Sequence, residues 1–383
     1  MTGIKLILST QYFVYFGILG VFLPFFNLYC YHIGFTGFEI GALSALKTLT
    51  TALFPMAWGA LSDRFNARKP IFVLCSFAAA GVWALFLLTT DFWIMFTITA
   101  FYGLFHAPLI SFLESFSMDI LGHEKTGYGR LRLWGSVSFI ITVLIVGHIL
   151  DMTGVGVILV IILAGSMLQS VLSLSLPKTG AKKEKRLKAE IRTFLTPKMA
   201  LFLAAAFLML VSHGTYYGFF SIHLEDLGFS RSFIGLAWGL ASVAEIGIMF
   251  FSTRIFARFS CERVLAASFI MAAIRWLIMA NAVSAGAIIF AQLFHAFSYG
   301  AFHIASILYI DANTPEESKT FGQAVNNAVT YGFGIMVGFL ANGWLFERLG
   351  AGNLFFISAC IAAAGGLIMG VEIMVGRYRS NTI

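Results

Sequence analysis

The chain has 383 residues, of which 59% are hydrophobic and 11% are charged. Soluble domains contain about 25% charged residues, so this composition argues against an ordinary water-soluble enzyme. Aromatic residues make up 16% of the chain, which excludes a disordered chain because such chains contain few aromatic residues. We therefore expect most of the apolar side chains to lie against lipid.

A membrane-spanning helix needs roughly 20 apolar residues, and the sequence contains twelve such segments separated by mostly short polar connections. The predicted spans are residues 8–31, 36–61, 70–90, 92–120, 130–150, 155–177, 198–224, 231–256, 264–281, 284–310, 319–346 and 352–376. They leave little chain for a soluble domain. We predict an all-α membrane protein whose function lies within its transmembrane helices.

Lysine and arginine indicate the orientation of these spans, because cytoplasmic loops of membrane proteins are enriched in both. With a cytoplasmic N-terminus, 21 of the 25 cations fall on the cytoplasmic side. An even number of spans then makes the C-terminus cytoplasmic too, and we expect a bacterial-type inner (plasma) membrane location. The net charge of +7 follows from this topology and does not indicate binding to nucleic acid.

The two halves of the chain resemble each other. HIGFTGFEIGAL at 32–43 matches DLGFSRSFIGLA at 226–237, and EKTGYG at 124–129 matches SKTFGQ at 318–323. Both matches have the same offset of 194 positions (226 minus 32, and 318 minus 124). We therefore predict a tandem repeat of two six-helix bundles, with parallel halves related by an axis along the membrane normal. The predicted domains are residues 1–177, a charged cytoplasmic linker at 178–197, and residues 198–383.

The predicted connection between the second and third spans, GALSDRFNARKP, matches the spacing of the major facilitator loop signature. Its matching residues are Gly59, Asp63, Arg64, Arg68 and Lys69. The resemblance implies a glycine that allows close helix packing and charged residues that form a breakable cytoplasmic latch between bundles. The alternative is a basic turn without a latch. Asn66 stands where the signature usually has glycine; since Asn tolerates a left-handed turn, we expect the turn to be kept.

Further motifs are more specific. TGYGRLRLWGSVSF at 126–139, the segment 212–246, IRWLIMA at 274–280 and the segment 290–310 resemble the phenylpropionate permease family of the major facilitator superfamily. That family is related to the lactose permease group of sugar and proton symporters. The resemblance covers most of the chain and implies proton-coupled transport of a small molecule on a major facilitator fold.

Several site residues follow from this resemblance. Glu114 and Arg132 take the places of the carboxylate and arginine with which the lactose permease group binds its substrate. Arg275 and His295 take the places of an arginine and a histidine in that group's proton-coupling network.

The acid that follows this histidine by one turn in the sugar permeases is replaced here by Ser298. Glu245 resembles the eighth-helix acid of the phenylpropionate permeases, so we predict that it carries the coupling proton. Arg275 and His295 would assist, because a motion that separates the carboxylate from the guanidinium changes how tightly the carboxylate holds a proton. A static salt bridge between Glu245 and Arg275 is the alternative.

Charges in the middle of apolar helices are informative in themselves, because each costs at least roughly 2.5–3.5 kcal/mol to insert. Lys47 is such a charge, and we predict that it faces a cavity and binds substrate; the alternative is a structural pair with an acid such as Glu114. His106 lies about 80° from Glu114 around a helix, so both can line one wall.

Other polar side chains in the spans are weaker candidates. We predict that Tyr217 stacks on a ligand and that Asn326 offers an amide, although packing explains aromatic residues equally well. His213 and His303 lie beside tyrosines and fit core histidines bonded to backbone carbonyls. No two histidines are spaced i, i+4 and the cysteines show no CxxC spacing, so we expect no metal and no cofactor.

The mid-helix cations Lys47, Arg132 and Arg275 outnumber the acids Glu114 and Glu245, which favours an anionic substrate. We predict a monomeric proton symporter that imports a small organic compound, most simply a monocarboxylate with an aromatic or apolar body. A nucleoside or sugar symporter is the alternative, and a drug and proton antiporter ranks third. The short connections argue against a membrane-bound enzyme.

Overall fold

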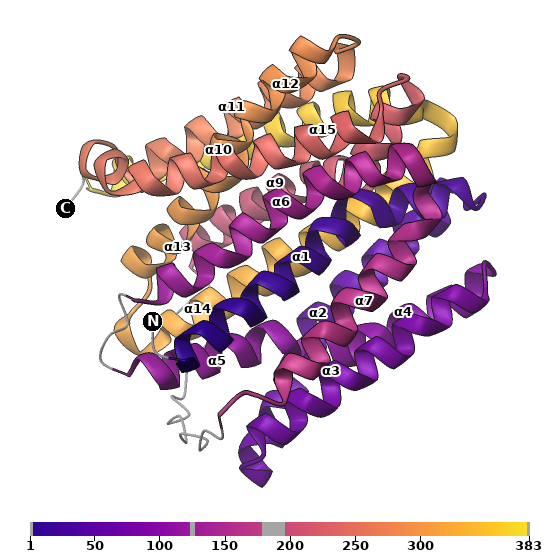
Figure 1. Cartoon of the computed structure of the whole chain (residues 1–383). Helices are drawn as coiled ribbons and strands as arrows, with labels where there is room; N and C mark the ends of the chain where they lie inside the picture. Colours follow the sequence, from indigo (N-terminus) through magenta and orange to yellow (C-terminus); the bar gives the residue numbers. More distant parts are fainter. Residues whose placement is uncertain (1–2, 123–126, 178–195, 381–383) are drawn as a thin grey trace. The chain divides into compact units, whose positions relative to one another are not determined.

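The computed structural model describes residues 3–122, 127–177 and 196–380. All regular elements in these residues are helices (Figure 1). The predicted linker, apart from residues 196 and 197, lies outside the described residues, as do residues 124–126 of the repeated motif.

The first half of the chain contains helices of very different lengths. They are α1 (Gly3–His32), α2 (Gly37–Phe65), α3 (Arg68–Ala84), η1 (Leu85–Leu88), α4 (Phe92–His106), α5 (Pro108–Leu121), α6 (Tyr128–Thr153), η3 (Val155–Val157) and α7 (Ile158–Ser173). The predicted span at 92–120 is divided into α4 and α5 because Pro108 occupies the first turn of α5. Proline cannot donate a backbone hydrogen bond inside a helix.

The second half repeats this pattern with two π-helical segments, η4 and η6. Its elements are α9 (Pro197–Asp226), α10 (Arg231–Arg258), α11 (Cys261–Asn281), α12 (Ala285–Leu293), η4 (Ala296–Ala301), α13 (Phe302–Asn313), η5 (Glu316–Ser318), α14 (Lys319–Asn326), η6 (Asn327–Gly334) and α15 (Ile335–Ser380). π-Helical turns are rare and occur frequently at functional sites.

Eleven described segments are long and apolar enough to cross a membrane, and the first ten coincide with predicted spans. The last segment, Lys319–Met374, has 56 residues, far more than the roughly 20 that one crossing needs. It contains Gly350, whose backbone (φ 71°, ψ 162°) is not helical. The chain therefore bends at the position where the sequence predicts a turn between its last two spans.

The helix boundaries repeat with the offset found in the sequence. α1 and α9 begin at residues 3 and 197 and end at 32 and 226, while α2 and α10 begin at 37 and 231. The turns before α2 and α10 contain Gly34 and Gly228, with φ of 91° and 84°. Glycine adopts this left-handed conformation without steric penalty, so both halves use the same residue for the same turn.

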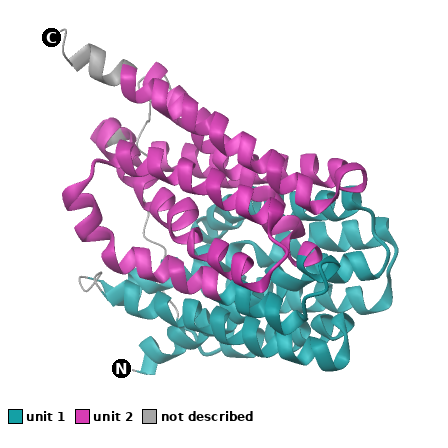
Figure 2. Ribbon diagram, turned by 90° about the horizontal axis from the view of Figure 1, so that it is seen from above, with its two compact units in different colours: residues 1–184, 224–239 teal, residues 185–223, 240–383 magenta. Residues whose placement is uncertain are grey.

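The chain forms two compact units (Figure 2). Unit 1 contains residues 1–184 and 224–239, and unit 2 contains residues 185–223 and 240–383. The segment 224–239, which includes the start of α10, thus groups with the first half of the chain although it belongs to the second repeat.

Unit 1 holds this segment by close packing and by hydrogen bonds. A Cβ atom at Gly147 would lie 2.6 Å from the carbonyl oxygen of Arg231, and one at Gly235 would lie 2.4 Å from that of Val143. The Asp151 carboxylate accepts hydrogen bonds from the backbone N–H of Arg231 at 2.7 Å and of Ser232 at 3.0 Å. The end of α6 therefore caps the start of α10.

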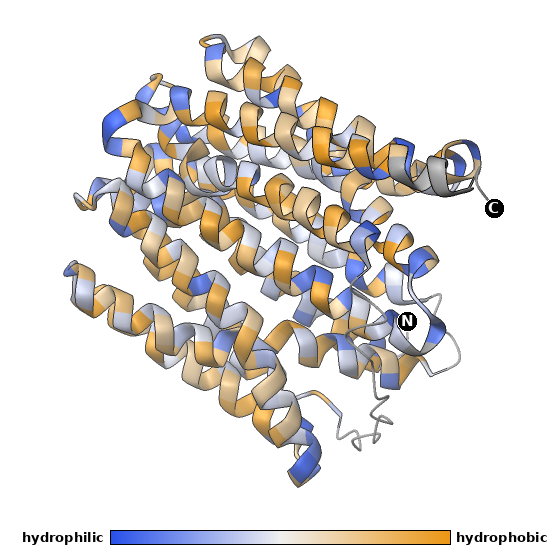
Figure 3. Cartoon of the chain, turned by 180° about the vertical axis from the view of Figure 1, so that it is seen from behind, coloured by the Kyte–Doolittle hydropathy of each residue, from blue (hydrophilic) through white to orange (hydrophobic). Residues whose placement is uncertain are grey.

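Hydrophobic residues are found along all the long helices (Figure 3), and many of the large ones are exposed. Met56, Leu88 and Phe250, for example, are 78–80% exposed. Such exposure is costly in water but is required of helix faces that contact lipid. The polar side chains discussed next are thus exceptions in an apolar surrounding.

Candidate functional site

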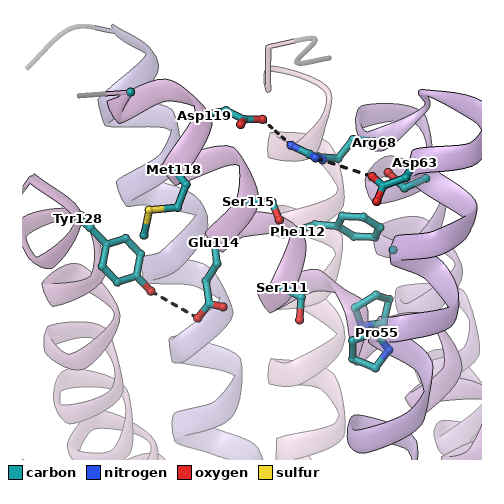
Figure 4. Close-up of a pocket in the computed structure, with 14 residues that line it drawn as sticks. Pro55, Asp63, Arg68, Ser111, Phe112, Glu114, Ser115, Met118, Asp119 and Tyr128 are labelled. Atoms are coloured by element: carbon teal, nitrogen blue, oxygen red, sulfur yellow. Dashed lines mark hydrogen bonds and ion pairs between the residues drawn. The ribbon is translucent and has the colours of Figure 1, made fainter. Parts of the chain in front are cut away.

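Unit 1 contains an open cavity of about 940 Å³ next to α2, α5 and α6 (Figure 4). Its lining residues are Pro55, Gly59, Ser62, Asp63, Arg68, Pro108, Ser111, Phe112, Glu114, Ser115, Met118, Asp119, Gly122 and Tyr128. The lining mixes hydroxyl groups and carboxylates with apolar surface, so the cavity suits a ligand that has both characters.

The end of α2 and the start of α3 line one part of this cavity. The Arg68 guanidinium donates to the Asp119 carboxylate of α5 and lies 3.9 Å from Asp63 (Figure 4). These described ion pairs of Arg68 are all inside unit 1, whereas the sequence predicted a latch between bundles. Arg64 lies over the ring of Phe65 instead, 5.6 Å from its centre.

Two further predictions for this loop have different outcomes. Asn66 ends α2 with φ 48° and ψ 42°, which confirms the left-handed turn expected of it. The prediction that Gly59 allows close helix packing is wrong, because no described residue lies within 4 Å of a Cβ atom built there. Gly59 lines the cavity instead.

Glu114 lines the cavity as predicted; it interacts electrostatically with Arg132 but forms no described ion pair with it. Its carboxylate accepts a hydrogen bond from the Tyr128 hydroxyl at 3.4 Å (Figure 4). The Arg132 guanidinium lies over the face of Phe16, 3.8 Å from the ring centre. Gly135 adjoins both Phe16 and Arg132. A Cβ atom built at Gly135 would lie 2.5 Å from the ring of Phe16. The missing side chain therefore gives Phe16 the space to contact Arg132.

Lys47 does not pair with Glu114 either. Its ammonium group lies 5.5 Å from the ring centre of Tyr102 and 5.9 Å from that of Phe22. Like Arg132, it forms no ion pair with a carboxylate in the described residues. Aromatic faces attract cations without neutralising them, so neither cation is held in a described salt bridge, although Arg132 still interacts electrostatically with Glu114.

His106 lies next to Lys47 but away from the cavity wall where it was predicted. Its ring is 2% exposed and stacks on Tyr15 at 5.2 Å and on Tyr102 at 4.7 Å between centroids. Neither ring nitrogen has a hydrogen-bond partner among the described residues. The predicted site residues of unit 1 thus divide into a cavity group with Glu114 and an aromatic group with Lys47 and His106.

Unit 2 brings Glu245, Arg275 and His295 together in a linear chain. The carboxylate of Glu245 lies 3.0 Å from Nε2 of His295, and Nδ1 of His295 lies 2.6 Å from Nη1 of Arg275. The predicted direct pair of Glu245 and Arg275 is absent from this described cluster because the imidazole lies between the two groups. Arg275 also donates to Gln292 at 2.9 Å and to Ser298 at 3.3 Å.

The chemistry of the partners determines which nitrogen of His295 carries its proton. A guanidinium can only donate hydrogen bonds, so Nδ1 of His295 must accept the bond from Arg275. The single proton of the neutral imidazole is then on Nε2, which donates to Glu245. A second proton on Nδ1 would break the bond to Arg275. In this arrangement His295 connects the two charges and does not store a proton.

The remaining candidates lie in the same unit. Tyr217 packs against the rings of Tyr216 and Tyr299, at 5.3 and 6.1 Å between centroids. Asn326 is buried; its oxygen accepts from Thr330 at 3.0 Å, and its amide nitrogen has no partner among the described residues. Neither contact identifies a ligand.

The two less certain histidines differ from each other. His213 bonds to the backbone carbonyl of Met209 at 2.8 Å, as expected of a core histidine. His303 instead bonds to the hydroxyl of Tyr331 at 2.6 Å. Sequence reasoning also missed Tyr128, Phe16 and Gln292, whose spacing in the sequence carries no signal for the contacts they make.

Comparisons with known proteins place the chain in a family. Residues 5–357 match the MFS_1 like family. The chain belongs to that family. It is 30% identical over 363 residues to the probable 3-phenylpropionic acid transporter of Escherichia coli, covering 93% of this chain and 94% of that protein.

Other members of the superfamily are more distant relatives. The maltose permease of Geobacillus stearothermophilus is 24% identical, covering 95% of this chain and 93% of that protein. The putative nucleoside transporter YegT of Escherichia coli is 24% identical, covering 89% and 84%. The chain is thus a multi-pass membrane transporter of the major facilitator superfamily and not an enzyme.

Solved structures agree on the fold. The nucleoside transporter NupG, in a point-mutant form, superposes with a TM-score of 0.89 at 16% identity and covers 97% of this chain and 100% of that chain. A bacterial homolog of the human lysosomal transporter Spinster gives a TM-score of 0.69 at 16% identity, with 96% and 94% coverage. At these identities the likeness concerns the fold of this MFS_1 like protein and not its substrate.

Proposed function

We propose that this transporter is a proton symporter that imports a small organic anion, most simply a monocarboxylate with an aromatic body such as a phenylpropionate-like acid. The observation that carries the proposal is the pair of cations in unit 1, Lys47 and Arg132, which rest on aromatic rings and form no described ion pair with a carboxylate. A carboxylate ligand would supply the missing charge, and its aromatic body would find similar rings nearby.

The series of contacts from Arg275 through His295 to Glu245 supports proton coupling. It connects a permanent positive charge through a neutral imidazole to a carboxylate that is able to take up a proton. A movement that alters the contact between His295 and Glu245 would change the proton affinity of that carboxylate. The relative named as a probable 3-phenylpropionic acid transporter supports the substrate class.

The proposal includes the architecture expected from the sequence. It has twelve spans, six in residues 1–177 and six in residues 198–383, joined by the linker at 178–197. It works as a monomer in a bacterial inner membrane, with both termini in the cytoplasm, and exposes its site alternately to the two sides. The bend at Gly350 and the offset of 194 in the helix boundaries support the twelve-span count.

A nucleoside or sugar symporter is the second candidate. The cavity of unit 1 offers Ser111, Glu114, Ser115 and Tyr128, which suit the hydroxyl groups of such ligands. Two relatives, a maltose permease and a putative nucleoside transporter, favour the same class.

A ligand screen separates the two candidates. The purified protein is heated with 3-phenylpropionate, maltose or uridine, since a ligand raises the unfolding temperature in proportion to RT ln(1 + [L]/Kd). We expect 3-phenylpropionate to stabilise the wild type and to lose this effect in Lys47→Gln. Stabilisation by uridine or maltose that persists in Lys47→Gln would contradict the anion proposal and support the second candidate.

A further inference from the structure

His106 of unit 1 has stacked ring faces and an unused ring edge. Its imidazole stacks on the rings of Tyr15 and Tyr102, at 5.2 and 4.7 Å between centroids, with interplanar angles of 17° and 27°. These two neighbours fix the plane of the imidazole, and the ring nitrogens lie in that plane. Both nitrogens are buried and have no hydrogen-bond partner among the described residues.

This lack of partners distinguishes His106 from other buried histidines of the described chain. His213 bonds to a backbone carbonyl, and His295 uses both of its nitrogens. A buried polar atom without a partner destabilises the folded protein. A stacked phenylalanine would avoid this loss, so the hydrogen-bonding capacity at position 106 has a reason other than packing.

His106 also lies beside a break in a helix. It is the last residue of α4, and Pro108 begins α5 two residues later. Proline has no backbone N–H, and the carbonyl of Leu104, four residues before it, accepts a hydrogen bond from the indole of Trp58 at 2.8 Å. Substrate sites of membrane transporters are typically built where spanning helices are discontinuous. His106 occupies such a position in the first repeat.

Close packing of α2 against α4 brings a cation to the same place. A Cβ atom at Gly103 would lie 2.1 Å from Oγ1 of Thr50, and this hydroxyl donates to the carbonyl of Lys47 at 2.7 Å. The Lys47 ammonium lies 5.5 Å from the ring centre of Tyr102, the ring on which His106 stacks. Lys47 and His106 also interact electrostatically. The two side chains thus share one neighbour, and neither has a described anionic partner.

A carboxylate ligand complements this pair of side chains. It carries a negative charge and two oxygen atoms that only accept hydrogen bonds. The ammonium group of Lys47 supplies donors and a positive charge, and a neutral imidazole supplies one N–H donor. An amide would leave the ammonium group without a counter-charge. Because hydrogen bonds to a charged group are stronger than neutral ones, the pair should discriminate an acid from its amide.

We propose that His106 is a substrate-binding residue that donates its N–H to the carboxylate held by Lys47. Both nitrogens are covered in this conformation, so the contact forms when side chains beside the helix break move aside. His106 is then accessible in only one part of the transport cycle. The assignment rests on the anion transport proposed above and adds a second donor to that site.

Histidine-selective ¹⁵N NMR of the full-length wild type in detergent tests the contact directly. The resonances that are missing from His106→Gln belong to His106, and addition of 3-phenylpropionate should shift them. The resonances of His148, an exposed histidine of α6, are the control and should stay in place. The neutral 3-phenylpropionamide should shift neither set. Unshifted His106 resonances, at a concentration of 3-phenylpropionate that raises the unfolding temperature, would overturn the proposal.

His106→Phe provides the second readout, because it keeps a ring for stacking and removes both nitrogens. Without ligand, its unfolding temperature should equal or exceed that of the wild type, since two unpartnered polar atoms are lost; a lower value would assign His106 to the fold. Its apparent affinity for 3-phenylpropionate should fall by about tenfold, as expected when a hydrogen bond to a charged group is lost. His148→Phe should bind as the wild type does.

The failure of this assignment and that of the proposed function give different results. Binding of 3-phenylpropionate to His106→Phe with wild-type affinity would refute the role of His106 and leave the anion proposal intact. Absence of binding to the wild type would refute the anion proposal and this assignment with it.

Discussion

The two units place their buried cations in opposite surroundings. In unit 1, Lys47 and Arg132 rest on aromatic faces and form no ion pair with a described carboxylate. In unit 2, Arg275 is 0% exposed and donates to His295, Gln292 and Ser298. The two cations of unit 1 are therefore able to bind an anionic ligand. In unit 2 the guanidinium of Arg275 is already hydrogen-bonded to protein side chains.

Under the proposed proton symport, this difference separates two tasks of the transporter. A cation that binds a substrate carboxylate has to be free before the substrate arrives, since a charge already paired gains little from a second partner. A cation that tunes a proton site has to be fixed at a constant distance, because the proton affinity of the carboxylate depends on that distance. Each unit satisfies one of these requirements.

The largest expected effect comes from removing the charge of Glu245, the carboxylate that contacts His295 in unit 2. Glu245→Gln resembles the permanently protonated state, so we expect exchange of 3-phenylpropionate to continue and accumulation against a gradient to be lost. Counterflow and pH-driven uptake in proteoliposomes measure the two steps separately. Full pH-driven accumulation by this variant would move the proton site elsewhere in unit 2. Loss of binding altogether would assign Glu245 to the substrate or to the fold.

The next test concerns the free cations of unit 1. Arg132→Lys keeps the charge but loses the planar fork that binds a carboxylate through two hydrogen bonds. We expect about tenfold weaker apparent affinity, which corresponds to roughly 1.4 kcal/mol, without a change in unfolding temperature. Uptake kinetics at several concentrations give the affinity. An unchanged KM would show that this guanidinium does not hold the substrate.

The same substitution in unit 2 should behave differently. Arg275→Lys leaves Gln292 or Ser298 without its donor in a buried site, and an unsatisfied buried group costs about 1–3 kcal/mol. We therefore expect a lower unfolding temperature for Arg275→Lys than for Arg132→Lys, measured without ligand in the same detergent. Equal unfolding temperatures for the two variants would contradict the contrast between the units.

The smallest expected effect is in the loop that borders the cavity of unit 1. Asn66 has a left-handed backbone, where an ordinary L-residue is strained by about 1–2 kcal/mol. Asn66→Ala should therefore lower stability by about 1 kcal/mol, whereas Asn66→Gly should not. Thermal unfolding of both variants measures the difference. A loss of stability in the glycine variant as well would assign the role of Asn66 to its side chain.

Much of the fold could be predicted because lipid imposes a simple rule on the sequence. Apolar segments of sufficient length must be helices, and the repeated motifs fixed the register of the two halves. The left-handed turn at Asn66 was predictable for a similarly local reason. The division of the predicted span 92–120 at Pro108 follows from the chemistry of proline. The sequence did not predict this division because the segment is apolar on both sides of Pro108.

The partners of the charged residues could not be predicted in the same way. Tyr128 and Arg132 are four residues apart on α6, so both are neighbours on one helix face, and the sequence does not indicate which of them contacts Glu114. The placement of His295 between Glu245 and Arg275 depends on side-chain directions across three helices. The π-helical turn beside His295 has no recognisable signal in the sequence.

The packing of residues 224–239 into unit 1 has a consequence for biosynthesis. The first 184 residues are translated before the segment that completes their unit, and about 55 further residues (239 minus 184) must follow. At roughly 5–20 residues per second, this takes several seconds. During that interval Gly147 and the carboxylate of Asp151 lack the helix start that packs against the one and bonds to the other. Maturation of the first unit therefore depends on how fast the ribosome synthesises the second repeat.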